Sequence, residues 1–459
     1  MGRTRNKRLE GVVQELGVSQ RQLAAHFRAV AAEHGATELQ SVAQPYIARW
    51  IGGASVEGRA RFILAETLSR GLGRLVTLAD IGLAADTKPE SESAWSDDTL
   101  TTLMTLGSTD MDIDRRRLLA TSVYSVAALT LPEDQWFARA ADRARTRRPL
   151  SSHVVTAQDV EDVREMAAIF SRRDQKRGGR SGRTALVAYL RADVADFLSG
   201  RFPSEEIRRG MTSAAAELAY LAGWTAFDGR EHPLAQRWLT IATSLAEEAG
   251  DTPLAGHALR AMAHQAVDLA KPRQAVQLAE ASLSSRRYTH ACWRERSLLG
   301  VVHARGLAAA GEKKAAVAAL LRAEQDLGKA GNREDEPTRV FFYTEASLAH
   351  ETAAALRDLG DLQGAEAQFI RSVRTRGAQF VRTHAVTLGS LGAVQAQQGH
   401  LDIACDTWSQ ALDAMTGVQS GRARETVVQM RRALSPFRNR SGSRAAELDA
   451  RARSMLRQA

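Results

Sequence analysis

The sequence has few of the residues on which disulfide-rich domains and many enzymes depend. Its 459 residues include two cysteines, Cys292 and Cys405, which are far apart and fall within helical patterns. We expect both to be buried, reduced thiols, which argues against a disulfide framework. Aromatic residues make up 5% of the chain, and alternation of β-branched with polar residues is nearly absent. The predicted fold class is therefore all-α.

The chain also lacks an apolar run long enough to cross a bilayer. Its most apolar run, residues 118–131, follows three arginines and has 14 residues, which is too short to span a membrane. We interpret it as a buried connecting helix that ends before Pro132. The basic start of the chain is not followed by an apolar stretch, so no signal peptide is expected. The predicted location is cytoplasmic, with no membrane partner.

Motifs of catalysis are missing as well. The sequence contains no cysteine cluster, no nucleophile elbow and no phosphate-binding loop after a strand. Its eleven histidines are scattered, and His350-Glu351 lacks the second histidine of a metalloprotease helix. The glycines of residues 178–182 indicate a turn. We therefore predict a protein that is not an enzyme and has no cofactor or metal site.

What the chain does contain is a repeat. Residues 217–228 carry apolar side chains at helical spacing, and a turn leads into a second helical run from Glu231. The same turn recurs four times, and an alanine follows four residues later in each copy, at Ala235, Ala275, Ala316, Ala365 and Ala404. The intervals of 40, 41, 49 and 39 residues are typical of helical repeats. They predict an α-solenoid of tetratricopeptide-like helical hairpins over residues 151–435, with a loop insertion at 328–337.

The net charge of +9 is unevenly distributed. Residues 86–114 hold eight acidic residues and one lysine, which predicts an acidic flexible linker. We expect connecting helices over residues 115–150 and a basic helix or tail over residues 436–459. Residues 172–183 hold six basic residues. Basic runs of this kind are usually solvated helix faces, but they are also compatible with an anionic partner.

Residues 1–85 form a different pattern, that of a small helical bundle. A first helix over residues 6–16 is predicted to end at Gly17, and Ser19 with Gln22 forms a capping box for a second helix. That helix should bury Leu23, Ala24 and Phe27. A further helix over residues 57–72 should bury Ala60, Ile63, Leu64, Thr67 and Leu68.

A short helix lies between these two. Pro45 suits its first turn and biases Gln44 toward an extended, capping conformation. Ile47, Trp50 and Ile51 should face the core, which leaves Gln44, Tyr46, Ala48 and Arg49 exposed. This layout is typical of a helix-turn-helix domain, in which glutamine and arginine can read base edges and a basic start can contact phosphate. The predicted DNA-binding residues are Arg5, Lys7, Ser19, Gln20, Arg21, Ser41, Gln44, Tyr46 and Arg49.

The first helices of the repeats should line a concave surface. Side chains there could meet a peptide, a small ligand or another protein, and the sequence does not separate these alternatives. The candidate groove residues are Trp224, His257, Arg260, Trp293, Arg296, Tyr343 and His384. For Trp224 and Trp293, each taken singly, a core position is the stronger interpretation.

Three stretches together resemble a known family. They are residues 16–24 with 46–53, residues 68–82, and residues 217–228. The chain is similar to actinobacterial cytosolic regulators that carry an amino-terminal helix-turn-helix of the phage-repressor (Xre-like) type and carboxy-terminal tetratricopeptide-like repeats. The resemblance implies transcriptional control, often of sporulation or secondary metabolism. The insertion over residues 29–40 is longer here than in a compact phage repressor.

The sequence therefore leads to two functional hypotheses. In the first, the chain is a DNA-binding transcriptional regulator whose repeats sense a ligand such as a peptide, bind protein and mediate dimerisation. Its expected partners are double-stranded DNA, a peptide or protein in the groove, and a second copy of the chain. In the second, it is a non-enzymatic scaffold or adaptor with no sequence-specific DNA binding. Burial of Arg49, or its pairing with Glu57, would favour the scaffold.

Overall fold

A computed structural model describes residues 5–33, 36–72, 74, 76, 78, 80–83, 95, 96, 98–112, 124, 125, 129, 131, 132, 134–284, 286–436 and 444–458. The chain divides into two compact units. The amino-terminal unit comprises Met1–Asp98 and Asp112–Phe137, and the repeat unit comprises Thr99–Met111 and Ala138–Ala459. Within the described residues the regular structure is helical, apart from an isolated bridge between Val154 and Arg201. The prediction of an all-α fold is confirmed.

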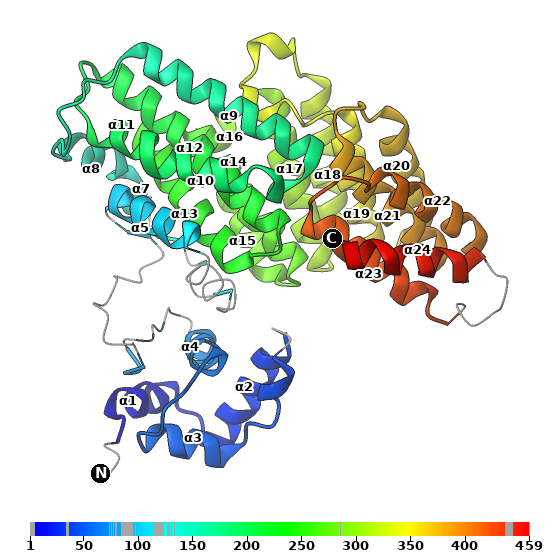
Figure 1. Cartoon of the computed structure of the whole chain (residues 1–459), viewed down its shortest axis with the longest axis horizontal. Helices are drawn as coiled ribbons and strands as arrows, with labels where there is room; N and C mark the ends of the chain where they lie inside the picture. The colour runs from blue at the N-terminus through cyan, green and yellow to red at the C-terminus, as the bar shows by residue number, and fades with distance from the viewer. Residues whose placement is uncertain are drawn as a thin grey trace. The chain divides into compact units, whose positions relative to one another are not determined.

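The amino-terminal unit is a bundle of four helices around one core (Figure 1). Its elements are α1 (Lys7–Leu16), α2 (Gln20–Glu33), a 3₁₀ turn η1 (Thr37–Leu39), α3 (Gln44–Ile51) and α4 (Arg59–Leu72). Asn6 caps α1 by accepting from the Leu9 N–H group, and Gly17 ends it in the left-handed conformation. All five residues that the sequence assigns to the buried face of α4 are buried. The helix begins two residues later than predicted.

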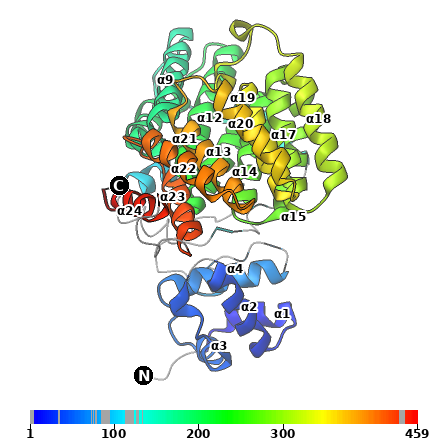
Figure 2. The same cartoon turned by 90° about the vertical axis from the view of Figure 1, so that its right-hand side faces the viewer.

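The repeat unit consists of helices packed in successive pairs (Figures 1 and 2). The pairs are α12 (Glu205–Asp228) with α13 (His232–Ala249), α14 (Thr252–Asp268) with α15 (Pro272–Leu283), α17 (Trp293–Ala309) with α18 (Lys313–Gly328), α19 (Glu345–Asp358) with α20 (Leu362–Thr375), α21 (Val381–Gln397) with α22 (Leu401–Ala414), and α23 (Gly421–Leu434) with α24 (Arg444–Gln458). Ahead of them lie α5 (Thr99–Met111), α8 (Ala140–Thr146), α9 (Ala157–Arg177), α10 (Arg183–Tyr189), the π-helical turn η4 (Leu190–Val194) and α11 (Ala195–Ser199). Short segments complete the unit, namely η3 (Gly179–Ser181), α16 (Arg286–Thr289), η5 (Arg333–Asp335) and η6 (Thr338–Val340). The short helix α7 (Asp134–Ala138) belongs to the amino-terminal unit except for its last residue.

The predicted repeat phase is confirmed at every turn. Each of the five turn residues is the N-cap of the second helix of its pair, and these residues are Glu231, Lys271, Glu312, Asp361 and His400. The five alanines four residues later are fully buried. An alanine is needed there because the two helices of a hairpin approach each other closely at that level. The chain continues with a sixth pair, α23 and α24, which the alanine pattern does not mark.

The residue before each of these N-caps adopts a left-handed backbone conformation. It is a glycine in three turns, at Gly311, Gly360 and Gly399, but Arg230 and Ala270 occupy it in the first two, with φ of 65° and 52°. Left-handed φ is costly for a residue with a Cβ atom and nearly free for glycine. The first two turns therefore carry backbone strain that the later ones avoid.

Replacing the exposed Ala270 with glycine should relieve this strain. We expect Ala270→Gly to raise the free energy of unfolding of the repeat unit by about 0.5–1 kcal/mol, since the relief exceeds the extra entropy of a glycine in the unfolded chain. Chemical denaturation followed by circular dichroism would measure the change. Ala310→Gly is the matched control, because Ala310 has an ordinary φ of −81° and should lose stability instead. A loss of similar size in both variants would contradict the prediction.

The predicted linker over residues 86–114 is wrong where it overlaps α5. Thr99–Met111 is a helix of the repeat unit that contacts α10, α11 and α13. Its buried Asp110 accepts hydrogen bonds from Arg183 at 2.8 Å and from the Trp238 indole at 2.9 Å. Acidic composition suggested a solvated segment, but this carboxylate has a buried cation as its partner. Residues 86–94, 97, 113 and 114 of the predicted linker lie outside the described residues.

Two other predictions concern the apolar residues 118–131 and the two cysteines. Most of residues 118–131, the predicted connecting helix, lies outside the described part of the chain. Cys405 is buried, as predicted, whereas Cys292 is half-buried at the start of α17, and both are free thiols. Among the described residues, no helix has both the length and the apolar character needed to cross a membrane.

The solenoid turns far enough for α9, which precedes its first pair, to contact α21 of its fifth pair, as Figure 2 shows. The basic stretch over residues 172–183 forms the end of α9 and the turn after it. There the Gln419 N–H group donates to the Arg177 carbonyl at 2.7 Å, and the Arg180 N–H group donates to the Gln419 carbonyl at 3.3 Å. A Cβ atom on Gly178 would lie 2.5 Å from the Gln419 oxygen, so only glycine allows this approach. The turn therefore joins the two ends of the repeat array.

The basic carboxy-terminal helix is also part of the fold. Ala445, Leu448 and Ala452 of α24 are buried against the preceding helices. Its arginines pair with nearby carboxylates, Arg444 with Asp406 at 3.1 Å and Arg451 with Asp413 at 2.6 Å. The excess of arginine in this segment is thus partly balanced by acidic residues of α22.

Candidate functional site

The short helix α3 presents the side chains that the sequence predicts. Ile47, Trp50 and Ile51 are buried, and Gln44, Tyr46, Ala48 and Arg49 are exposed. The helix starts at Gln44, with Ala43 as its extended N-cap, so the predicted capping role of Gln44 is wrong by one residue. Pro45 lies in the first turn, where its missing N–H group costs nothing. The result is a polar face on a helix held firmly from behind.

Two contacts fix α3 against α2. The rings of Phe27 and Trp50 pack with their centroids 5.4 Å apart. The Arg28 guanidinium donates to the Val42 carbonyl at 2.8 Å, which ties α2 to the segment that leads into α3. The sequence analysis did not identify Arg28. Because the connection between the two helices is long, this bond supplies an anchor that a three-residue turn would not need.

The exposed polar face of α3 is free of internal ion pairs. Within the described residues, Arg49 has neither a carboxylate within 4.0 Å nor a hydrogen-bond partner for its guanidinium, and Gln44 likewise has no side-chain hydrogen bond. Glu57 is not paired with Arg49. Tyr46 is 45% exposed and lies edge-on to Trp50, with ring centroids 6.4 Å apart. These side chains can therefore contact a partner without first losing an intramolecular bond.

The start of α2 has the predicted capping box. The Gln22 N–H group donates to the Ser19 hydroxyl at 3.3 Å, and the Ser19 N–H group donates to the Gln22 side-chain carbonyl at 2.9 Å. Arg21 is exposed and Gln20 is half-buried at this helix end. Ser41 is exposed just ahead of α3. An exposed helix start of this kind is suited to a phosphate group.

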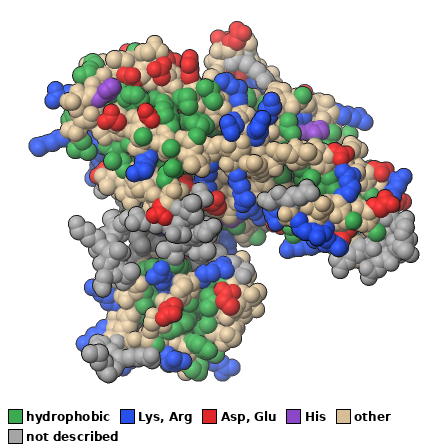
Figure 3. All heavy atoms as spheres, in the orientation of Figure 1, with side chains coloured by type: hydrophobic (Ala, Val, Ile, Leu, Met, Phe, Trp, Pro, Cys, Tyr) green, Lys and Arg blue, Asp and Glu red, His purple; other side chains and the backbone are tan. Residues whose placement is uncertain are grey.

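The basic start of the chain lies next to the end of α3. The Asn6 N–H group donates to the Ile51 carbonyl at 2.9 Å, and the Asn6 side-chain amide donates to the Ile81 carbonyl at 2.9 Å. Arg5, one residue earlier, forms an exposed ion pair with Glu10, and Lys7 is exposed. Arg5 is therefore held near the helix that carries Arg49. Figure 3 shows Lys and Arg side chains around the rim of the visible face of this unit.

The seven candidate groove residues of the repeat unit do not form one site. Trp224, Arg260 and Tyr343 line a common cavity, and His257 lies behind Arg260. Trp293 is 37% exposed and stacks with Arg296 and Lys329, with their charged groups 4.2 and 4.6 Å from the ring centre. Neither Trp293 nor Arg296 nor His384 lines the cavity. The interpretation of Trp293 as a core residue is also wrong, whereas Trp224 is mostly buried.

The cavity occupies the inner side of the solenoid, where the first helices of the repeats converge. Its empty space is about 660 Å³ when the open solvent at its mouth is included, and the centres of water-sized molecules can occupy about 60 Å³ of it. It is lined by α9, α12, α14, α17, α19, α21 and α23. The connection between α18 and α19 extends beyond the predicted insertion of residues 328–337, and its Phe342 and Tyr343 line the cavity. A smaller space of about 330 Å³ adjoins it and shares Gln175, Trp224 and Phe342.

The connection between α18 and α19 is anchored by a buried charge network around Arg339. Arg339 donates to both carboxylate oxygens of Glu295, at 2.9 and 3.0 Å, and lies 3.4 Å from Asp251. Burial opposes the charge of Glu295, but Arg339 and His257 outweigh it and hold the pKa of this carboxyl below its usual range. Burial raises the pKa of Glu217, at the edge of the same network, to about 7, with Arg339 opposing the shift. The network thus holds the loop against α12 and α17.

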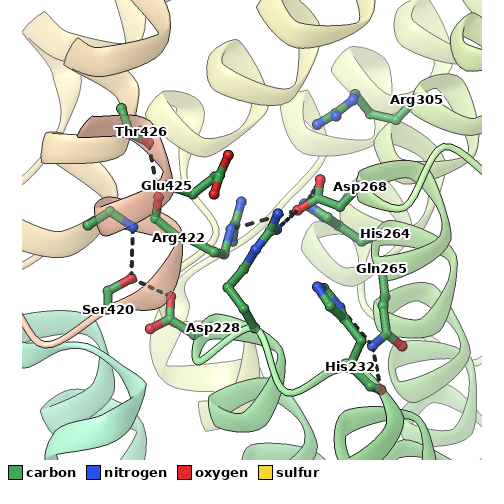
Figure 4. A network of polar contacts seen from close by, with 12 residues as sticks. Asp228, His232, His264, Gln265, Asp268, Arg305, Ser420, Arg422, Glu425 and Thr426 are labelled. Atoms are coloured by element: carbon green, nitrogen blue, oxygen red, sulfur yellow. Dashed lines mark hydrogen bonds and ion pairs between the residues drawn. The ribbon is translucent and has the colours of Figure 1, made fainter. Parts of the chain in front are cut away.

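A second network closes the array at the cavity wall, and Figure 4 shows part of it. The buried Asp228 accepts from Arg382 at 2.9 Å, from the Ser420 hydroxyl at 2.9 Å and from the Gly179 N–H group at 3.0 Å. Arg382 also pairs with Asp174 at 3.1 Å. Arg382 and Asp174 are 208 residues apart in the chain. Thr383 and Gln175, which form a neighbouring hydrogen bond, are equally far apart. The sequence analysis missed Arg382 because helical periodicity does not mark contacts between the two ends of a solenoid.

Comparison with known proteins adds one family resemblance. Residues 9–84 match a family described as the SP15 N-terminal domain. The match covers the helices of the amino-terminal unit and leaves the repeat unit unassigned. Neither the curated proteins nor the solved structures include a match to this chain.

Over the described ranges, no group of three or more His, Cys, Asp or Glu side chains is arranged to hold a metal ion. The two candidate sites that the geometry provides are therefore the exposed face of α3 and the central cavity.

Proposed function

We propose that this chain is a sequence-specific DNA-binding regulator that reads DNA with α3 and binds a ligand or partner with its repeat unit. The observation that carries the proposal is the exposed face of α3, on which Gln44 and Arg49 have no side-chain partner among the described residues, above a buried apolar face. Glutamine and arginine can each make two hydrogen bonds to a base edge in the major groove. A helix of eight residues held by its partner helix is suited to that groove.

Neighbouring residues supply contacts to the DNA backbone. Arg5 and Lys7 lie near the end of α3, and Ser19, Gln20, Arg21 and Ser41 lie at the helix starts. Contacts to phosphate position a protein on the duplex without selecting a sequence. Residues 1–85 hold eleven Lys and Arg against seven Asp and Glu. Their net charge is therefore positive, as binding to the DNA backbone requires. The matching SP15 family description does not itself name an activity.

The scaffold alternative would be favoured by a buried or internally paired Arg49. The exposure of Arg49 and the absence of a pair with Glu57 among the described residues speak against it. Control of transcription is part of the proposal and follows from the resemblance of residues 16–24 with 46–53, 68–82 and 217–228 to Xre-like regulators with repeats. Dimerisation through the repeat unit is a further part of the proposal.

Arg49→Ala tests the DNA-binding role. We expect it to weaken binding to a cognate site by about 1–3 kcal/mol, or roughly 5- to 150-fold in Kd, because a bidentate base contact is lost. Thermal stability should stay nearly unchanged, since the side chain is exposed. The site would come from capture of genomic DNA bound by the tagged full chain, and fluorescence anisotropy at two salt concentrations would give Kd.

Arg74→Ala is the matched control for this experiment. Arg74 is exposed and pairs with Glu15 at the end of α1 that is remote from Asn6 and α3. Its removal lowers the charge by the same amount and should reduce affinity for all sequences equally, and only slightly. An equal loss in the two variants, or no enriched DNA site at all, would refute reading by α3 and favour the scaffold.

A further inference from the structure

The central cavity of the repeat unit is lined by more positive than negative side chains. Four arginines line it against two carboxylates, and these groups are Arg260, Arg376, Arg382, Arg422, Asp228 and Glu351. On the face of the repeat unit drawn in Figure 3, by contrast, basic and acidic side chains are interspersed. Since charges taken out of water need a compensating charge, each of these arginines should have a carboxylate partner.

Two of the four arginines have such partners. Arg382 lies between Asp174 and Asp228, and Arg422 lies 4.0 Å from Asp268, as Figure 4 shows for the second pair. Glu351 forms an ion pair with Arg305 at 2.6 Å. Across the described part of the chain, no carboxylate lies within 4.0 Å of the Arg260 or Arg376 guanidinium. The cavity therefore contains two cations without an ion-pair partner.

Arg260 is held in place by neutral groups. It is 2% exposed, and its guanidinium donates to the Tyr220 hydroxyl at 2.8 Å and to the His257 ring at 2.9 Å. The other ring nitrogen of His257 donates to Glu295 at 2.9 Å, which fixes the tautomer that can accept from Arg260. Burial, assisted by Arg260, lowers the pKa of His257 to about 4, so the ring stays neutral. The Arg260 Nε atom has no hydrogen-bond partner among the described residues.

Arg376, like Arg260, is bonded to neutral groups. It donates to the Ala346 carbonyl at 3.0 Å and to the Ser372 hydroxyl at 2.8 Å, and its Nε atom has no partner within the described structure. Burial lowers the pKa of its guanidinium to about 10, although Glu351 partly opposes the shift. Without an added anion, the fold thus disfavours the charge of this residue.

We infer that the central cavity binds a small organic anion whose carboxylate or phosphate group is held by Arg260 and Arg376. Guanidinium groups match both oxyanions because their N–H groups form a planar fork. The apolar body of the ligand would lie against the aromatic side chains of the lining, Trp224 and Phe342. His264, whose pKa burial lowers to about 4, adds a neutral ring to the same wall.

This inference deepens the ligand-sensing part of the proposed function and rests on the repeat unit alone. It can fail while DNA binding by α3 stands, because the experiment that tests it contains no DNA. The anion could belong to a free metabolite or to the carboxyl terminus of a peptide. Those sources share the chemistry that the two arginines recognise, and different probes distinguish them.

Calorimetric titration of the full chain tests the inference with three probes at matched ionic strength. Phenyl phosphate represents a phosphate ligand, phenylacetate a free carboxylate, and N-acetylphenylalanine the carboxyl end of a peptide. N-acetylphenylalaninamide has the same shape as the last probe without its charge. We expect saturable binding of at least one anion and none of the amide. Arg376→Gln should weaken that binding at least about tenfold.

Arg374→Gln is the matched control, because Arg374 is exposed on α20 two residues before Arg376. It should bind the same probe as the native chain does. Thermal unfolding without a probe gives a second readout, in which Arg376→Gln should be at least as stable as the native chain, since it removes a half-buried charge that has no carboxylate within 4.0 Å among the described residues. Absence of saturable binding by all three anions, equal binding by the amide, or a lower Tm of Arg376→Gln would overturn the inference.

Discussion

Arg382→Met is expected to lower the free energy of unfolding of the repeat unit by about 3–5 kcal/mol, the largest effect of any substitution considered. Arg382 is 3% exposed and compensates two carboxylates that are themselves buried, Asp174 and Asp228. Methionine fills much of the same volume but leaves both carboxylates without a cation. Burial already raises the pKa of Asp174 to about 6 even with Arg382 beside it. A variant without Arg382 should therefore take up a proton at this site or open the contact.

The position of Arg382 explains why the effect should spread. It joins α21 to α9 and α12, so its loss weakens the closure of the array as well as one ion pair. Urea denaturation followed by circular dichroism would measure the change, and hydrogen exchange of α9 would show whether the ends separate first. Arg451→Met is the control, since Arg451 pairs with Asp413 at the surface and should contribute less than about 1 kcal/mol. A loss below about 1 kcal/mol in both variants would show that the network is dispensable.

Asp110→Ala is expected to cost about 3 kcal/mol, because Asp110 connects α5 to two other helices. The substitution leaves the Trp238 indole N–H group without an acceptor and removes one of the two carboxylates that compensate Arg183. Glu231 still pairs with Arg183 at 2.9 Å, so the loss should be smaller than that for Arg382. Denaturation of the full chain would measure the loss.

Limited proteolysis gives a direct test of the role of α5. If Asp110 holds α5 against α13, the variant should be cut within Thr99–Met111 faster than the native chain. Thr105→Ala provides the control, because Thr105 is exposed on the same helix and its removal should change stability by about 0.5 kcal/mol or less. Unchanged cutting of α5 in Asp110→Ala would mean that this helix is held by its apolar side chains alone.

The two candidate sites can be compared by how their charges are balanced. On α3 the unpaired Arg49 is exposed, so water solvates it until a partner binds. In the cavity the unpaired Arg260 and Arg376 are largely removed from water, so their charge costs stability in the empty protein. The first arrangement suits a salt-dependent contact with a large anion such as DNA. The second suits a small anion that replaces the missing counter-charge.

Much of this protein is determined by local sequence pattern. The five buried alanines and their turns, the capping box of Ser19 and Gln22, and the division of α3 into a buried and an exposed face all follow from residues within a few positions of one another. Helical periodicity, capping and close helix crossing are short-range rules, so a single sequence is sufficient to apply them.

The tertiary structure alone decided the rest. Composition placed Asp110 in a linker, yet a buried arginine 73 residues away makes it part of the fold. The periodicity of Val381–Gln397 identifies a helix but does not indicate that Arg382 meets Asp228 across 154 residues. Likewise, Arg260 and Arg376 are recognisable as a site only because the curvature of the array brings them to one cavity, where no described carboxylate lies within 4.0 Å of either. Long-range charge pairing depends on how successive repeats are rotated, and that rotation is the sum of many small packing differences that no local motif records.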